Sequence, residues 1–175
     1  MKKKIFSVVL VFAMLFCTLL AGGCGDGGEP VSIYPVLSAE SAKPGDTVQV
    51  SVYIDNAKRF CSTDFYLSYD ANYVTFVNNT AESVPDLMFE LTNGADSAGN
   101  AYVKFTGLTL KTLDMTDCKL FTAEFKVRDD APAGEPFFGI AVGEYYKGED
   151  ANGDKTTNIV SDVTEGGAKL AVTVG

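Results

Sequence analysis

The sequence predicts an all-β fold, namely a two-sheet antiparallel β-sandwich of the jelly-roll type with roughly nine strands. Several short segments alternate apolar and polar residues with a period of two, which gives each strand one apolar face for a shared core. Turn-forming Gly, Pro, Asn and Asp residues recur between these segments. No window of the sequence has a long helical period, which disfavours a helical core.

Five segments carry the alternation most clearly and are expected as strands whose apolar side chains face inward. In chain order they are residues 47–54, 64–70, 102–106, 120–127 and 170–174. Turns are expected at residues 43–46, 92–94, 98–100, 132–134 and 152–154. The largely polar stretch 111–117 is expected as a loop with at most one helical turn.

The first residues of the chain have the composition of an export signal. Lys2, Lys3 and Lys4 precede an apolar run, and the run ends in the small residues directly before Cys24. This ending resembles the lipobox of bacterial lipoproteins, which implies cleavage before Cys24 and a diacylglycerol on its thiol. Two acyl chains suffice for stable anchoring. The alternative is an ordinary cleaved signal peptide with an incidental cysteine.

The expected organisation is therefore a signal peptide at 1–23, a lipidated cysteine with a flexible tether at 24–30, and one domain at 31–175. The protein should be exported and held at the bacterial cell surface through its lipid alone. With 14 basic and 23 acidic residues, its formal net charge is −9, which argues against nucleic acid and against direct binding to anionic lipid.

The composition also argues against most kinds of catalysis. The sequence has no His and no Trp, which removes His-dependent triads and the commonest zinc sites. It contains no phosphate-binding loop or nucleophile elbow, and no motif places two carboxylates for glycoside hydrolysis. We therefore expect a binding module rather than an enzyme, with no cofactor of its own.

Two cysteines, Cys61 and Cys118, remain once Cys17 leaves with the signal peptide and Cys24 carries lipid. An even pair in an oxidising compartment could form a disulfide. The alternative is two small, half-buried thiols, because the expected topology does not obviously bring these residues together.

One acidic segment begins like a calcium-binding loop. Asp150, Asn152 and Asp154 have the spacing of the first ligands of an EF-hand loop. The match then fails, because Lys155 stands where Gly is needed and Ser161 stands where the bidentate acid belongs. An acidic hairpin loop is the better interpretation, and a weak calcium site is the alternative.

The order of strands and turns resembles that of the cohesin domain over residues 31–174. Five pieces carry the resemblance in the right order: 43–48 before the second strand, 63–70 in the third, 120–127 as the sixth, 131–134 after it, and the Gly166-Gly167 turn before the last strand. Cohesins bind dockerins, which are small calcium-loaded helical modules carried by other proteins. The resemblance therefore implies a dockerin-bearing partner that brings its own calcium, in a cellulosome-type assembly for polysaccharide degradation.

In cohesins, a sheet built from the third, fifth, sixth and eighth strands meets the dockerin. The resemblance places Asp64 where the family commonly has a polar residue that accepts hydrogen bonds from the dockerin. Tyr66 offers a rigid aromatic anchor beside it. The full candidate face comprises Ser62, Asp64, Tyr66 and Ser68 of the third strand, Tyr102, Lys104 and Thr106 of the fifth, and Leu120, Thr122 and Glu124 of the sixth.

Two other functions stay open from the sequence. A carbohydrate-binding surface lipoprotein with a related sandwich fold would use tyrosines as stacking surfaces, namely Tyr66, Tyr102, Tyr145 and Tyr146. A structural or adhesive surface domain would share only the architecture of cohesins. Binding to insoluble polysaccharide would favour the former.

Overall fold

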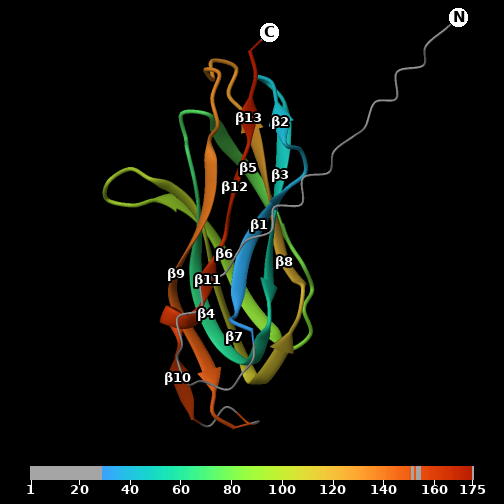
Figure 1. The fold of residues 1–175 in the computed structure, drawn as a ribbon, viewed down its shortest axis with the longest axis vertical. Coiled ribbons are helices and arrows are strands. Elements are labelled where there is room, and N and C mark those ends of the chain that lie inside the picture. The colour runs from blue at the N-terminus through green and yellow to red at the C-terminus, as the bar shows by residue number, and fades with distance from the viewer. Residues whose placement is uncertain (1–28, 151, 153–154, 175) are drawn as a thin grey trace, which may run out of the picture.

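The computed structural model describes residues 29–150, 152 and 155–174 and builds them almost entirely from strands (Figure 1). The expectations for the signal peptide, for Cys24 and for Asp154 lie outside the described residues. Within the described ranges, no helix has the length and apolar character needed to cross a membrane.

The long strands include four of the five alternating segments expected from the sequence, and four further long strands lie outside those segments. They are β1 (Ser32–Leu37), β3 (Thr47–Asp55), β4 (Ala57–Tyr69), β5 (Val74–Ala81), β6 (Leu87–Ala95), β7 (Ala101–Met115), β8 (Cys118–Val127) and β9 (Phe137–Gly148). The short ones are β2 (Ser41–Ala42), β10 (Thr156–Asn158), β11 (Thr164–Glu165), β12 (Gly167–Lys169) and β13 (Ala171–Val172), with one 3₁₀ turn, η1 (Val160–Asp162).

Two sheets face each other across the core. The five-stranded sheet has the order β11-β1-β3-β8-β5, and the six-stranded sheet has the order β10-β9-β4-β7-β6, with β12 also paired to β9. Most pairs are antiparallel, whereas β1 with β11 and β13 with β2 are parallel. This arrangement confirms the predicted sandwich.

Three stacked aromatic rings join the sheets through the core. The rings of Phe65 on β4 and Phe105 on β7 have centroids 5.0 Å apart, and Phe121 of β8 lies 6.2 Å and 6.0 Å from them. All three side chains are at most 1% exposed. Because side chains alternate along a strand, this packing fixes which residues of β4 and β7 point outward.

The strand expected at 170–174 forms only over Ala171–Val172, and Val174 is 54% exposed rather than inward. Two further local expectations were wrong, and both concern the hairpin formed by β6 and β7. The expected loop at 111–117 instead belongs largely to β7, which continues to Met115. The expected turn at 92–94 lies inside β6, and the chain reverses after Ala95, where the hairpin tip projects sideways from the sandwich (Figure 1). Because β6 is an edge strand, it tolerates the Asn-Gly pair that would weaken a central strand.

Candidate partner-binding face

The outer face of the six-stranded sheet is a regular grid of side chains from β6, β7, β4 and β9. Adjacent residues in each row are cross-strand partners, so the rows follow directly from the register of the sheet. In order along the face, the rows are Met88–Leu108–Ser62–Tyr146, Glu90–Thr106–Asp64–Glu144, Thr92–Lys104–Tyr66–Ala141 and Gly94–Tyr102–Ser68–Gly139.

Seven of the sequence-predicted residues lie together on this face. They are Ser62, Asp64, Tyr66 and Ser68 from β4, and Tyr102, Lys104 and Thr106 from β7. Their side chains occupy the two middle columns of the grid, because β4 and β7 are the central neighbours of the sheet. The structure thus brings both predicted rows into one contiguous surface.

The other three predicted residues, Leu120, Thr122 and Glu124, do not belong to this face. They lie on β8, which is in the five-stranded sheet. Leu120 is only 2% exposed, since a register shift against β3 leaves it between the pairs of Phe121 and Lys119 and turns it inward. The Thr122 hydroxyl contacts the Ser51 hydroxyl at 3.0 Å on the far side of the molecule.

The misplacement has one cause, which is that β6 is absent from the alternating segments expected as strands. Counted without β6, β7 is the fifth strand and β8 is the sixth. If the two-residue β2 is set aside, the third, fifth, sixth and eighth strands are β4, β6, β7 and β9, which together form this face. Alternation of Leu87, Phe89 and Leu91 with polar or exposed neighbours was the available signal for β6.

A chain of polar and aromatic contacts crosses the middle of the face. The Lys104 ammonium lies 3.0 Å from Oδ2 of Asp64 and 5.4 Å from the centroid of the Tyr66 ring. Tyr66 in turn meets Tyr102 edge to face, with centroids 5.1 Å apart. The hydrogen bond that the Lys104 ammonium donates to Asp64 raises the pKa of Lys104. The contacts hold the central side chains in one arrangement.

One carboxylate oxygen of Asp64 accepts no hydrogen bond from the described residues. This oxygen, Oδ1, is buried and has no hydrogen-bond partner among them. On the neighbouring strand β9, Gly143 has no register partner on β4, because Asp64 pairs with Glu144 and the next residue pairs with Val142. A Cβ atom added to Gly143 would lie 2.6 Å from Oδ1 of Asp64. The bulge at Gly143 therefore makes room for the carboxylate. An unpaired buried acceptor is costly unless a donor reaches it.

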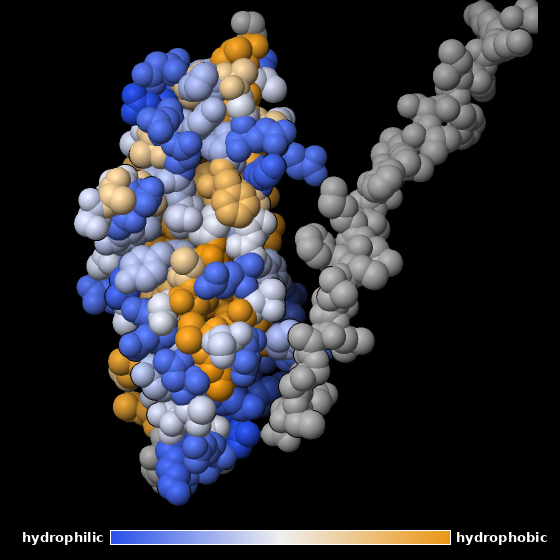
Figure 2. Space-filling view, turned by 60° about the vertical axis from the view of Figure 1, so that its left-hand side comes forward, coloured by the Kyte–Doolittle hydropathy of each residue, from blue (hydrophilic) through white to orange (hydrophobic). Residues whose placement is uncertain are grey.

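The two ends of the face differ in character. At one end Met88, Leu108 and Leu110 are 48%, 45% and 82% exposed, which makes an apolar patch beside the polar centre. At the other end an open groove of about 950 Å³ runs between the β4–β5 turn and the β6–β7 hairpin tip. Figure 2 brings the β9 side of the molecule forward and shows apolar surface in the middle of that side, with hydrophilic surface at its lower end.

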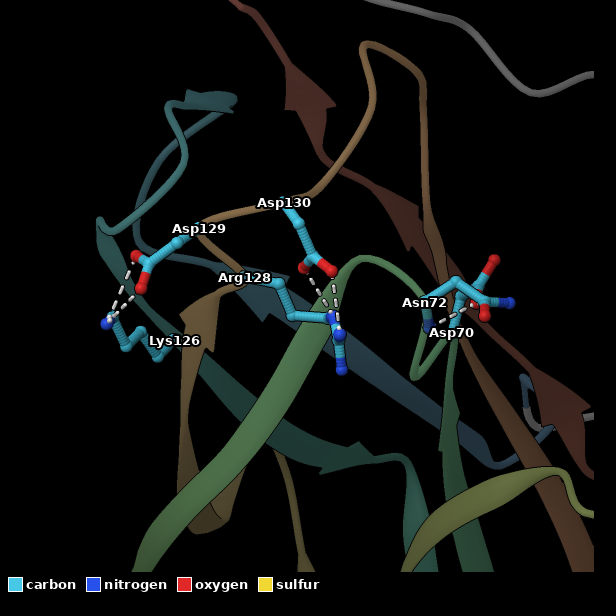
Figure 3. A network of polar contacts seen from close by, with 6 residues as sticks. All are labelled: Asp70, Asn72, Lys126, Arg128, Asp129 and Asp130. Atoms are coloured by element: carbon cyan, nitrogen blue, oxygen red, sulfur yellow. Dashed lines mark hydrogen bonds and ion pairs between the residues drawn. The ribbon is translucent and has the colours of Figure 1, made fainter.

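A separate polar network lies where β4 turns into β5 and where β8 leaves its sheet (Figure 3). Arg128 donates from Nε and Nη2 to the two carboxylate oxygens of Asp130, at 2.9 and 3.0 Å. Lys126 lies 3.3 Å from Asp129. The hydrogen bonds from Arg128 to Asp130 raise the pKa of Arg128 and lower the pKa of Asp130. Since these exposed charges pair with each other, this network is a weaker candidate for a binding site.

The cysteines and the acidic loop complete the account of the predicted sites. Cys61 is buried in the six-stranded sheet and Cys118 is half-buried in the five-stranded sheet, and both are free thiols, so the disulfide is not formed. In the acidic loop, the Asn152 amide donates to Oδ1 of Asp150 at 3.0 Å. Among the residues described, no three acidic, Cys or His side chains gather in a metal-binding group.

Comparison with known proteins gives a family match and several similar folds. The family model described as the cohesin domain matches residues 35–169. No curated protein sequence is significantly similar to the chain.

Three solved structures illustrate the similarity of the fold. The seventh ScaB type I cohesin from Pseudobacteroides cellulosolvens has 18% identity and a TM-score of 0.62, with 84% of this chain and 94% of that chain covered. A non-cellulosomal cohesin from the archaeon Archaeoglobus fulgidus has 18% identity and a TM-score of 0.58, covering 83% and 92%. The Coh-OlpA-Doc918 cohesin–dockerin complex from Clostridium thermocellum has 18% identity and a TM-score of 0.54, covering 81% and 99%.

Proposed function

Because this chain belongs to the cohesin domain family, we propose that it is a non-catalytic module that binds a dockerin-bearing protein through the outer face of its six-stranded sheet. The observation that carries the proposal is the buried, unpartnered Oδ1 of Asp64 at the centre of that face. Similar folds include complexes of cohesins with dockerins from Clostridium thermocellum and Acetivibrio cellulolyticus, which supports this class of partner.

The face suits association with a folded partner. Its residues stand on paired strands rather than on loops, so that little conformational entropy is lost on binding. Tyr66 and Tyr102 supply rigid aromatic area, and the exposed Met88 and Leu108 supply apolar area at one end. A hydroxyl or amide of the partner would donate to Asp64, and a hydrogen bond to a charged group is of the stronger kind. The calcium belongs to the dockerin in this proposal.

The location of the module is the second part of the proposal. The small residues before Cys24 favour lipidation, which would tether the domain to the surface of the exporting cell. The acidic domain itself has little affinity for anionic lipid. The protein would then hold a dockerin-bearing partner, such as a polysaccharide-degrading enzyme, at the cell surface. Substitution Cys24→Ser should release the protein from the membrane fraction, and retention there would contradict the lipid anchor.

The test is a pull-down from the secreted proteins of the source organism with the immobilised protein, in calcium and then in EDTA. We expect calcium-dependent capture of a dockerin-bearing protein, because chelation unfolds the calcium loops of the partner. The double variant Asp64→Ala/Tyr66→Ala should lose the capture. The matched control Glu124→Ala, which alters the five-stranded sheet, should retain it. Equal capture by both variants would refute the proposed face.

A further inference from the structure

The groove at the Ser68 end of the face is lined by aromatic and by small side chains. Tyr66 and Tyr102 line it from β4 and β7, and Phe137 lines it from β9. Between them the lining includes Ser68 and Ala141, which leave the space open. The Ser68 hydroxyl donates to the carbonyl of Gly139 at 3.0 Å and is thereby fixed in the floor. A volume of about 950 Å³ is at the upper end of the range for sites that bind small molecules.

Phe137 presents an exposed ring in this groove even though it is a large apolar residue. Its side chain is 52% exposed. The ring lies against the cross-strand pair Gly139–Gly167, where a Cβ would come within 2.7 Å of it at Gly139 and 2.1 Å at Gly167. The two glycines therefore let the ring lie close to the backbone of β9 and β12. This support holds the ring as a platform with one side toward solvent.

Two self-bonded turns form the rims of the groove. In the β4–β5 turn, Oδ1 of Asp70 accepts hydrogen bonds from the backbone and side-chain amides of Asn72, at 2.9 and 3.0 Å. In the β6–β7 turn, Asp96 accepts from the backbone of Ala98 and from both amides of Asn100, at 2.8 to 2.9 Å. These bonds fix the polar rims before any ligand arrives, which lowers the entropic cost of binding.

We infer that this groove binds a neutral oligosaccharide, a ligand distinct from the protein partner although both would contact Tyr66 and Tyr102. The C–H groups on one face of a pyranose ring carry partial positive charge and pack on the negative face of an aromatic ring. The rim oxygens that these turn bonds do not use, namely Oδ2 of Asp70 and the side-chain oxygens of Asn72 and Asn100, are suited to accept hydrogen bonds from sugar hydroxyls. None of the described residues that line the groove is a Lys or Arg, which disfavours an anionic ligand.

A basic peptide fits the groove less well than a neutral sugar. The Asp96 carboxylate already accepts hydrogen bonds on both of its oxygens, and the bonds from Asn100 lower its pKa. Its charge is thus stabilised without an external cation. The groove also differs from the carbohydrate site expected from sequence, because Tyr145 is fully buried and Tyr146 lies in the opposite end row of the face. In the groove, Phe137 provides the aromatic stacking surface that the sequence predicted at Tyr145 and Tyr146.

The experiment is a titration of the folded protein with cellohexaose, xylohexaose and mannohexaose at millimolar concentration, followed by calorimetry and by amide chemical shifts. We expect at least one hexaose to bind saturably and to shift residues of the groove. Phe137→Ala should lower the association constant about tenfold, and Phe137→Trp should preserve it. The matched control Leu110→Ala removes an exposed apolar side chain from the other end of the face and should leave sugar binding unchanged.

The outcomes separate this inference from the docking of a dockerin. Asp64→Ala should lose the protein partner and keep the sugar, because Asp64 does not line the groove. Absence of binding by all three hexaoses overturns the inference, as does equal binding by Phe137→Ala in protein whose thermal unfolding shows it to be folded. It is also overturned if Phe137→Ala reduces only the capture of the dockerin-bearing protein, since the groove would then belong to the protein interface.

Discussion

The two outer faces of the sandwich arise from the same alternation of residues, but they differ in how far their polar side chains are paired with one another. On the five-stranded sheet, Tyr34 and Tyr53 stack with centroids 5.7 Å apart, and the Tyr34 hydroxyl donates to Asp117 at 3.1 Å. Lys119 pairs with Glu82 at 2.7 Å. On the six-stranded sheet, one buried oxygen of Asp64 has no partner among the described residues.

This difference indicates that the five-stranded face is an ordinary solvent-exposed surface, whereas the six-stranded face is suited to binding. The polar groups of the five-stranded face largely satisfy one another, so a partner would gain little by covering them. The six-stranded face combines an unsatisfied acceptor with exposed aromatic and aliphatic side chains, and covering such groups is favourable. Exposure alone would not have distinguished the faces, since Val36 of β1 and Val77 of β5 are 44% and 49% exposed.

The largest expected effect comes from removing the core that both faces share. Phe121 is fully buried and stacks on rings of the opposite sheet. Phe121→Ala should lower the free energy of unfolding by about 3–5 kcal/mol, from lost burial and the cavity left behind. Urea unfolding monitored by circular dichroism measures this loss. A variant as stable as the parent would show that the sheets do not depend on this stack.

The next effect is confined to the six-stranded face. Asp64→Ala should weaken dockerin binding by about 2 kcal/mol or more, because it removes an acceptor and leaves Lys104 unpaired in the interface. Binding measured by calorimetry should be unchanged in Thr122→Ala on the five-stranded face. Parent-like affinity of the Asp64 variant would erase the contrast between the faces.

Gly143→Ala sharpens the same comparison without removing the carboxylate. The added Cβ would lie 2.6 Å from Oδ1 of Asp64 and should displace it, so that dockerin affinity falls although Asp64 remains. Overpacking of this kind costs about 1–3 kcal/mol of stability, which thermal unfolding would register. Full affinity in this variant would mean that the position of the carboxylate does not matter.

A smaller effect is expected on the five-stranded face at high pH. Burial, together with the hydrogen bond to Asp117, raises the pKa of Tyr34 from 10.0 to about 12. The unfolded chain therefore loses this proton at lower pH than the folded one, and stability should decline as pH rises from 10 toward 12. Tyr34→Phe should make this decline shallower and leave dockerin binding intact. An unchanged pH profile of the unfolding free energy would count against the Tyr34–Asp117 bond.

The smallest effect concerns the two thiols, one in each sheet. Burial raises the pKa of both Cys61 and Cys118, so both should react slowly with iodoacetamide in the native protein and rapidly in urea. Cys118 is the less buried and should react first. Mass spectrometry of a time course gives the order, and a faster Cys61 would contradict it.

The sequence was sufficient for the fold class and for the middle of the candidate face. The alternation around Asp64 and Tyr66 placed this part of β4 correctly, because Phe65 and Leu67 between the outward residues are strongly apolar. It failed at β6, where Asn93 and Gly94 signal a turn but lie in an edge strand. That single omission shifted the strand count and moved the β8 residues to the wrong face.

Other features depend on contacts that no local pattern contains. The bulge at Gly143 matters because β9 lies beside Asp64, almost 80 residues earlier in the chain. Likewise, the ring of Phe137 depends on Gly167, which belongs to a different strand. Nothing in the sequence links Gly143 to Asp64 or Gly167 to Phe137, because each contact is made across paired strands. Pairing between strands has to be known before either can be recognised.

The parallel pairing of β1 with β11 also has a consequence for the order of events during folding. Ser32 is the register partner of Thr164, and the Thr164 amide donates to the carbonyl of Val31 at 2.7 Å. The edge of the five-stranded sheet therefore stays open at β1 until residues near 164 lie beside those near 32. Pairing over such a separation in sequence makes folding slow. The backbone of β1 should thus be among the last to gain its full set of hydrogen bonds.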